Sequence, residues 1–492
     1  MNYMKFLVAA TSVAACSVLT QTASFAQNVV VFGGSGSSAL FNTLARAART
    51  AGFANGGTYT IASGNASAGF VNDPTTTVAE RGNLFVSWSG TAGSRRIVYY
   101  LSVDSTVGVR AYQNNAALGT TGGGSFPAPS GNAITIPNFN TGSFPNDVAL
   151  PADVETTIKS QPFNAGGTDI APASALETTQ RTFALGYSAT NPIRSSYSTA
   201  TVTPVAFNLS GRTSSLFNIG ASPVVVFVNR TDAAAGGLGS SDANNINRFT
   251  LAGFYTGDFL RTSDIIPTSG LSEKFVTANQ RELLSGTYVT FEFNVPQSIA
   301  VNSSQENGVA ENPLNETNDT PGITGGRRRV VGTGQMISST NTVANSLGYA
   351  FWSTGSFSAN AAGNTKYLTV DGVEPLRDAY VNGVYPSGSD ITFKNVRNGS
   401  YPIWAILRLV LPAAPAGDLA AFTGAISPDD VVPANELLVF RSFRGSGTIS
   451  ASNGIVTGES ARGTDSGGAV FLINNEINFS TDTGLELTGF RQ

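Results

Sequence analysis

Four short segments of the sequence are rich in hydroxyl residues or glycines, and three of them also contain charged side chains. They read GGSGSSALF from residue 33, YLSVDSTVGVRAY from residue 100, GGTDIAP from residue 166 and RELLSGTYVTFEF from residue 281. Hydroxyl groups and free amides at the start of a helix favour an anion. An arginine beside them adds a paired, charge-assisted donor. Together the segments indicate a binding site for an oxyanion.

The order of these segments resembles that of the periplasmic phosphate-binding proteins of ABC transporters, a family with the type II substrate-binding-protein fold. GGTDIAP is similar to that family's Gly-Ala-Ser-Asp-Ala-Pro, and the last segment matches its arginine and Ser-Gly-Thr turn without a gap. The resemblance covers about residues 28 to 410. It implies an α/β fold of two lobes with a ligand cleft between them, loop-rich insertions and additional C-terminal strands.

The resemblance also implies which residues bind the oxyanion. They are Ser38, Ala39, Ser105, Asp169, Arg281, Ser285, Gly286 and Thr287. Asp169 differs from the others because an ionised carboxylate only accepts hydrogen bonds. A protonated phosphate oxygen can donate to it, whereas fully ionised sulfate would leave like charges unpaired. Asp169 is therefore the predicted source of selectivity.

Each residue also has an ordinary structural interpretation. Arg281 alone would be a surface or ion-paired arginine, Asp169 a cap of a helix or turn, and Ser38 a plain N-cap. Arg327 to Arg329 are interpreted as a solvated edge, with docking to a transporter or surface as the alternative. Ala39 replaces the family's usual aromatic residue and Val107 one of its glycines. Both departures alter the predicted pocket wall, so the ligand can differ from phosphate.

Apolar periodicity predicts the elements that position these segments. Strands or strongly apolar segments are predicted at 29–32, 84–88, 96–100, 222–229, 347–352 and 403–410, and helices at 40–48 and 249–255. Gly33 to Ser38 is predicted to form a turn. Residues 113–150 and 302–329 are predicted insertions. Further strands are predicted at 469–473 and 485–488.

The composition excludes several kinds of chemistry. The chain has no histidine, and its one cysteine is Cys16. Ser-His-Asp and Cys-His catalysis and histidine-ligated metals are therefore excluded. We predict no catalytic residue, metal or cofactor. A net charge of −4 provides no general attraction for nucleic acid, and we expect a monomer.

The first 26 residues have the pattern of a secretory signal peptide: Lys5, a short apolar run, and small residues before Gln27. Cleavage near Ala26 predicts a periplasmic or secreted protein. Lipidation at Cys16 is the less favoured alternative, because the uncharged stretch continues past it. The predicted division is 27–220 for the first part of lobe I, 221–397 for lobe II, and 398–492 for the return to lobe I plus a C-terminal extension.

Three functions fit the sequence to different degrees. The leading hypothesis is a non-catalytic, exported protein that captures phosphate or a similar tetrahedral oxyanion for uptake by an ABC-transporter permease. The alternative is a structural or adhesive surface or extracellular-matrix protein built on the same fold. Hydrolysis of phosphate esters is a poor third, because the sequence offers neither metal ligands nor an activated nucleophile.

Overall fold

The structure is a computed structural model. It describes residues 27–53, 56–61, 69–70, 80–118, 137–138, 142–143, 148–176, 178, 212–266, 273–297, 305, 314–315, 326–330, 332–353, 356–357, 363–387, 390–397, 399–426, 438–439, 448–449 and 456–457. The predicted signal peptide, most of both predicted insertions and the strands predicted at 469–473 and 485–488 lie outside the described residues.

The chain has a mixed α/β architecture in which a 13-stranded sheet carries helices on its faces. The helices are α2 (Phe41–Thr50), α3 (Ser105–Gln113), α4 (Ala152–Ser160), α6 (Arg248–Thr256), α7 (Gly286–Asn294), α8 (Gly332–Thr342), α10 (Lys394–Arg397) and α11 (Gly417–Ile426), with 3-10 turns η1 (Ser38–Leu40) and η2 (Thr262–Asp264). The large sheet contains β1 (Val29–Ser37), β2 (Gly57–Ile61), β5 (Asn83–Ser89), β6 (Arg96–Val103), β9 (Ala165–Thr168), β10 (Ser214–Asn229), β12 (Thr277–Arg281), β13 (Leu314–Asn315), β14 (Gly326–Val330), β15 (Ser346–Phe351), β16 (Thr365–Tyr367), β18 (Trp404–Pro412) and β19 (Leu438–Val439).

Four small two-stranded sheets complete the described elements. They pair β3 (Gly69–Phe70) with β4 (Glu80–Arg81), β7 (Pro137–Asn138) with β8 (Gly142–Ser143), β11 (Asn245–Ile246) with β17 (Thr369–Val370), and β20 (Thr448–Ile449) with β21 (Val456–Thr457).

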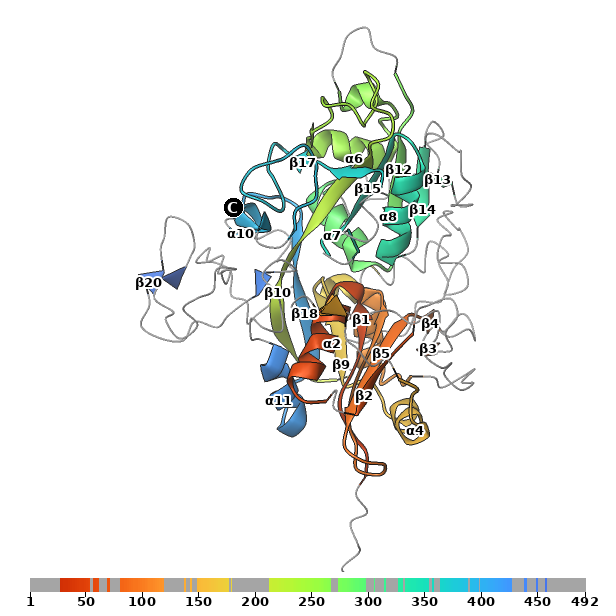
Figure 1. Cartoon of the computed structure of the whole chain (residues 1–492), viewed down its shortest axis with the longest axis vertical. Coiled ribbons are helices and arrows are strands. Elements are labelled where there is room, and N and C mark those ends of the chain that lie inside the picture. Colours follow the sequence, from red (N-terminus) through yellow and green to blue (C-terminus); the bar gives the residue numbers. More distant parts are fainter. Residues whose placement is uncertain are drawn as a thin grey trace, which may run out of the picture.

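The large sheet runs in the order β13-β14-β12-β15-β10-β18-β9-β1-β6-β5-β2. Figure 1 shows two bodies along it. We call the body of β1, β2, β5, β6 and β9 with α2, α3 and α4 the first lobe. The body of β12 to β15 with α6, α7 and α8 is the second lobe. The long strands β10 and β18 lie between them and join the two lobes (Figure 1).

Strand β10 changes partner along its length. Ser214 to Pro223 pair with β18, and Val224 to Val228 pair with β15 in the second lobe. The boundary predicted between residues 220 and 221 falls inside this strand. A single continuous strand therefore enters both lobes.

In the first lobe, β1 is parallel to both β6 and β9. Its register sets Ser37 beside Val103 and Gly36 beside Gly167. Since parallel strands end at the same edge of a sheet, the residues that follow β1, β6 and β9 lie together there. The second lobe repeats this arrangement, because β12 is parallel to β14 and Arg281 lies beside Val330.

The predicted turn at Gly33 to Ser38 is wrong, since β1 continues as a strand through Ser37. Glycines are required there for packing. A Cβ on Gly33 would lie 2.6 Å from the ring of Tyr99, and one on Gly36, whose φ is +136°, would lie 1.9 Å from the Gly167 carbonyl oxygen. The glycine-rich segment is thus a tightly packed strand end.

The predicted solvated edge at Arg327 to Arg329 is also wrong, and so is the docking-patch alternative. These arginines form the middle of β14, between β12 and β13, and their side chains are 0%, 2% and 0% exposed. Arg327 Nη1 donates to the carbonyls of Tyr255 and Gln305 at 3.0 and 3.1 Å. Buried backbone carbonyls from other segments therefore take the place of water around Arg327.

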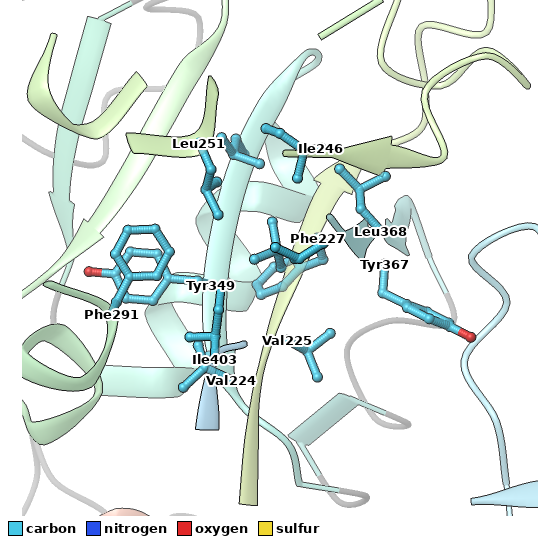
Figure 2. Close-up of a cluster of buried hydrophobic side chains, with 14 of the residues drawn as sticks. Val224, Val225, Phe227, Ile246, Leu251, Phe291, Tyr349, Tyr367, Leu368 and Ile403 are labelled. Carbon is cyan, nitrogen blue, oxygen red and sulfur yellow. The ribbon is translucent and has the colours of Figure 1, made fainter. Parts of the chain in front are cut away.

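The second-lobe core centres on β10 and β15, and Figure 2 shows its side chains. Phe291 of α7 stacks on Tyr349 of β15, with ring centroids 3.9 Å apart and planes 13° from parallel. The Tyr349 hydroxyl accepts the backbone N–H of Arg281 at 3.3 Å. The core thus fixes α7 and the end of β12 relative to each other. Within the described part of the chain, no helix is long and apolar enough to span a membrane.

Candidate oxyanion site

Asp169 lies at the end of β9, where the first-lobe strands end together. Its side chain is 3% exposed. The Ser105 hydroxyl donates to Asp169 Oδ1, and the Ser105 oxygen accepts the Asp169 backbone N–H at 3.4 Å. Ser37 adds a second side-chain hydrogen bond. Three segments distant in sequence therefore converge on one carboxyl group, as the parallel register requires.

Burial raises the pKa of Asp169 from 3.8 to about 6, since a charged carboxylate loses its hydration there. The hydrogen bond from Ser105 and the positive charge of Arg281 act in the opposite direction. Near neutral pH Asp169 is therefore mainly ionised and accepts hydrogen bonds. It becomes a donor as the pH falls below about 6.

The N-terminus of α7 approaches this carboxyl directly. Ser285 is the N-cap, and its side chain accepts the Tyr288 N–H at 3.4 Å. A Cβ on Gly286, the first helical residue, would lie 1.5 Å from Asp169 Oδ1 and 2.4 Å from Ser105 Oγ. Glycine is therefore needed for this approach. The positive end of the α7 dipole faces a carboxylate supplied by the chain itself.

Further contacts hold the two lobes together beside Gly286. Leu283 and Leu284, which precede α7, are buried in the apolar cluster of the first lobe with Val107 of α3. The Thr106 hydroxyl donates to the Leu284 carbonyl at 2.7 Å. Helices α3 and α7 therefore meet through both apolar and polar contacts.

Arg281 ends β12 and is 2% exposed. Its Nε and Nη2 each lie 2.7 Å from an oxygen of Glu282, so the paired face of the guanidinium is engaged within the chain. Nη1 donates to Thr287 at 3.2 Å and to Thr333 at 3.3 Å. The end of β12 thus contributes the charge, and the first turns of α7 and α8 contribute two hydroxyl groups.

A third carboxyl group completes the cluster. Asp104 is the N-cap of α3 but makes no side-chain capping bond. Its Oδ1 lies 3.7 Å from Arg281 Nη2, and its carboxyl group hydrogen-bonds to Glu282. Burial first, and then the charge of Glu282, raises the pKa of Asp104 well above its ordinary value. Of the two carboxyl groups, Asp104 is therefore the one that holds a proton more readily, and it can use that proton in a hydrogen bond to Glu282.

Glu282 remains the charged member of that pair. Burial alone would raise the pKa of Glu282, but the charge and hydrogen bonds of Arg281, together with the hydrogen bond of Asp104, hold the pKa below its ordinary value. The Gly332 N–H also donates to both Glu282 oxygens, at 3.0 and 3.1 Å. Arg281 and Glu282 are thus a neutral ion pair with several additional hydrogen bonds.

The structure brings together six of the eight predicted residues: Ser105, Asp169, Arg281, Ser285, Gly286 and Thr287. Ser38 is instead exposed, and the buried hydroxyl that reaches Asp169 belongs to the preceding Ser37. Ser37 also caps η1 by accepting the Ala39 N–H at 3.3 Å. The plain N-cap interpretation of Ser38 is therefore wrong by one residue.

Sequence reasoning missed the acidic residues of the site. Asp104 and Glu282 directly precede and follow predicted ligands, and that adjacency was the available signal. Groups of three or more residues suited to hold a metal ion are absent from the described part of the chain. The arrangement is that of a hydrogen-bonding cluster with one arginine and three carboxyl groups.

No protein-family model and no curated protein matches the chain. Among solved structures, it is similar to an ABC-type phosphate transport receptor from Vibrio cholerae (14% identity, 46% of this chain and 72% of that chain, TM-score 0.28). It is also similar to a phosphate-binding protein from Stenotrophomonas maltophilia (13%, 66% and 74%, TM-score 0.32). A third is the ancestral soluble variant of the human phosphate-binding protein (13%, 77% and 80%, TM-score 0.35). At these identities and TM-scores, the function has to be inferred from the chain's own side chains.

Proposed function

We propose that the chain is a non-catalytic solute-binding protein for a tetrahedral oxyanion of the phosphate class. It is exported, acts as a monomer, and delivers its ligand to an ABC-transporter permease. Residues 27–220 and the chain from 398 form lobe I, and residues 221–397 form lobe II. The proposed ligands are the eight residues predicted from the sequence, together with Ser37, whose buried hydroxyl bonds to Asp169 as that of Ser105 does.

The observation that carries this proposal is the meeting of Asp169, Ser105 and the N-terminus of α7 beside Arg281. Amides at a helix start, several hydroxyl groups and a buried guanidinium are donors suited to an oxyanion. Asp169 supplies an acceptor among them. A ligand with both acceptor oxygens and an O–H group satisfies this set, and phosphate is the simplest such ligand.

Calorimetric titration with phosphate tests the proposal. Truncating a buried charge partner costs about 2–5 kcal/mol. Arg281→Ala should therefore raise the Kd for phosphate about 30-fold to several-thousand-fold. Arg248→Ala is the matched control, since Arg248 pairs with Asp371 in the second lobe with both side chains about one-third exposed. Undiminished affinity in Arg281→Ala would overturn the proposal.

Two further measurements sharpen this test. Arg281→Lys keeps the charge but loses the planar fork, so it distinguishes the binding role from a general electrostatic effect. A thermal-shift screen with phosphate, arsenate, sulfate and molybdate identifies which oxyanion stabilises the folded chain. Asp169→Asn should weaken discrimination against sulfate, and an unchanged phosphate-to-sulfate ratio would contradict the role of Asp169.

A structural or adhesive surface protein is the second candidate, and the pairing of Arg281 with Glu282 favours it. An arginine whose paired face is already engaged can serve the fold alone. Binding of a matrix or partner that is lost when the residues after 426 are deleted, together with no response to any oxyanion, would support this candidate.

A further inference from the structure

The acidic residues around Arg281 set a condition on any ligand of this site. We propose that Glu282, assisted by Asp104, is a specificity determinant that restricts the site to singly charged oxyanions carrying hydrogen-bond donors of their own. Dihydrogen phosphate represents this class. The inference rests on the proposed function and names the form of ligand that the site accepts.

The first support is the geometry of the guanidinium. Arginine has five N–H donors. Two bind the Glu282 oxygens at 2.7 Å, and Nη1 contacts the hydroxyls of Thr287 and Thr333. Arg281 thus neutralises Glu282, and little of its charge is left to balance a dianion. A ligand has to compete with Glu282 for the paired face or bind through the hydroxyl groups.

The second support is the net charge of the side chains around Glu282 and Asp104. Glu282 faces Arg281, Asp104 and the Gly332 amide of α8. Asp104 faces Glu282, Arg281 and Asp169. Arg281 and Glu282 cancel each other's charge, so with Asp169 ionised above about pH 6 the four side chains carry a net negative charge whether or not Asp104 is protonated. A doubly charged ligand would meet like charge here, which disfavours it.

The third support is the supply of acceptors. The carboxylate oxygens of Asp169 and Glu282 can accept hydrogen bonds but not donate them while ionised. The Glu282 oxygens already accept from Arg281 and from the Gly332 N–H, so Asp169 is the acceptor that a ligand meets. An O–H group of a monoanion satisfies Asp169, whereas sulfate has no O–H group to donate.

Calorimetric titration of the protein with inorganic phosphate across the second ionisation of phosphate tests this inference. Only the monoanion should bind tightly, so the affinity should fall about tenfold per pH unit above that ionisation. Asp169 stays ionised over this range. Burial lowers the pKa of Lys366 to about 8, so Lys366 also titrates in this pH range. It binds the Ser240 carbonyl at 2.6 Å in the second lobe. Sulfate keeps its charge, so a parallel sulfate titration reports any contribution of the protein's own groups.

Glu282→Gln is the decisive variant, because it removes the competing charge while preserving side-chain shape. Its affinity for sulfate should rise at least about tenfold, or about 1.4 kcal/mol, and its phosphate affinity should lose most of the pH dependence. Glu155→Gln is the matched control, since Glu155 pairs with Lys159 on the surface helix α4 and should change neither value.

The outcomes separate the two proposals. Phosphate affinity that follows the dianion or ignores pH, or sulfate affinity unchanged by Glu282→Gln, would overturn the specificity role and leave the proposed function intact. If Glu282→Gln does not fold, the pH dependence of phosphate affinity in the unmodified protein still tests whether the site is restricted to the monoanion. Absence of phosphate binding at every pH, in both proteins, would overturn the proposed function itself.

Discussion

Replacing Gly286 with alanine tests whether α7 and Asp169 meet in solution. The added Cβ would lie 1.5 Å from Asp169 Oδ1, 2.4 Å from its Cγ and 2.4 Å from Ser105 Oγ. Asp169 cannot move away freely, because it is buried and held by Ser105 and Ser37. Either the carboxyl group loses these hydrogen bonds or the two helices separate.

The expected cost follows from these contacts. Inserting one methyl group into a packed site costs about 1–3 kcal/mol. Displacing a hydrogen bond to a charged group adds about 1.5–3 kcal/mol. The higher helix propensity of alanine returns at most about 1 kcal/mol. Gly286→Ala should therefore lower the free energy of unfolding by about 2–5 kcal/mol.

Urea unfolding followed by tryptophan fluorescence and circular dichroism measures this loss as a lower midpoint at an unchanged m value. Gly334→Ala is the matched control, because Gly334 lies within α8 and a Cβ there has no atom within 4 Å. It should stabilise the chain by up to about 1 kcal/mol. In the background of Asp169→Ala, most of the loss caused by Gly286→Ala should disappear. A Gly286→Ala midpoint equal to that of Gly334→Ala would refute the contact.

Three other changes test the same region. The pKa of Asp169 is about 6 in the folded chain and 3.8 ordinarily, so the folded state holds the proton more tightly and the free energy of unfolding falls as the pH rises through this window. Asp169→Asn does not titrate. Its free energy of unfolding, measured by denaturant titration, should therefore rise relative to that of the wild type by up to about 3 kcal/mol between about pH 4 and pH 7. Thr106→Val removes the buried donor to the Leu284 carbonyl and should lower the free energy of unfolding by about 1–3 kcal/mol. The control, Thr156→Val on the exposed face of α4, should change it by no more than about 0.5 kcal/mol. Equal losses in the two variants would contradict the role of Thr106. Tyr349→Phe removes the hydroxyl that joins β15 to the end of β12, and a drop of about 1–3 kcal/mol in unfolding free energy is expected.

The strands with strong apolar patterns could be predicted from the sequence. The runs at 29–32, 84–88, 96–100 and 222–229 all lie in large-sheet strands whose interiors are buried. A continuous apolar run marks a strand covered on both faces, so the signal is local. The end of β1 was missed because glycines carry no apolar pattern, and their role depends on the rings of Tyr99 and Tyr100 in the neighbouring strand.

Arg327 to Arg329 show what local pattern cannot reveal. Three consecutive arginines resemble a solvated segment until their acceptors are known. Those acceptors include the carbonyls of Tyr255 and Arg281, which precede them by many residues. Burial of these side chains is a property of the assembled sheet, so no window of sequence around them contains it.

The candidate site was also predictable from the sequence only in part. The order of the segments, through the family that it resembles, was sufficient to predict that Ser105, Asp169 and Gly286 lie close together. Periodicity did not resolve Ser37 from Ser38, since a one-residue extension of β1 decides which hydroxyl is buried. The pairing of Glu282 with its own neighbour depends on side-chain rotamers, which the motif does not specify.

The pairing of Arg281 with Glu282 links stability to ligand choice. A buried guanidinium without a partner would destabilise the fold by several kcal/mol, so Glu282 and its Gly332 contacts make the buried arginine tolerable in the absence of ligand. The same partner then opposes any ligand that needs the paired face of Arg281. A stronger internal pair therefore requires a ligand that brings less charge and more donors. In the proposed binding role, the balance between Glu282 and the ligand decides whether Arg281 serves binding or only the fold.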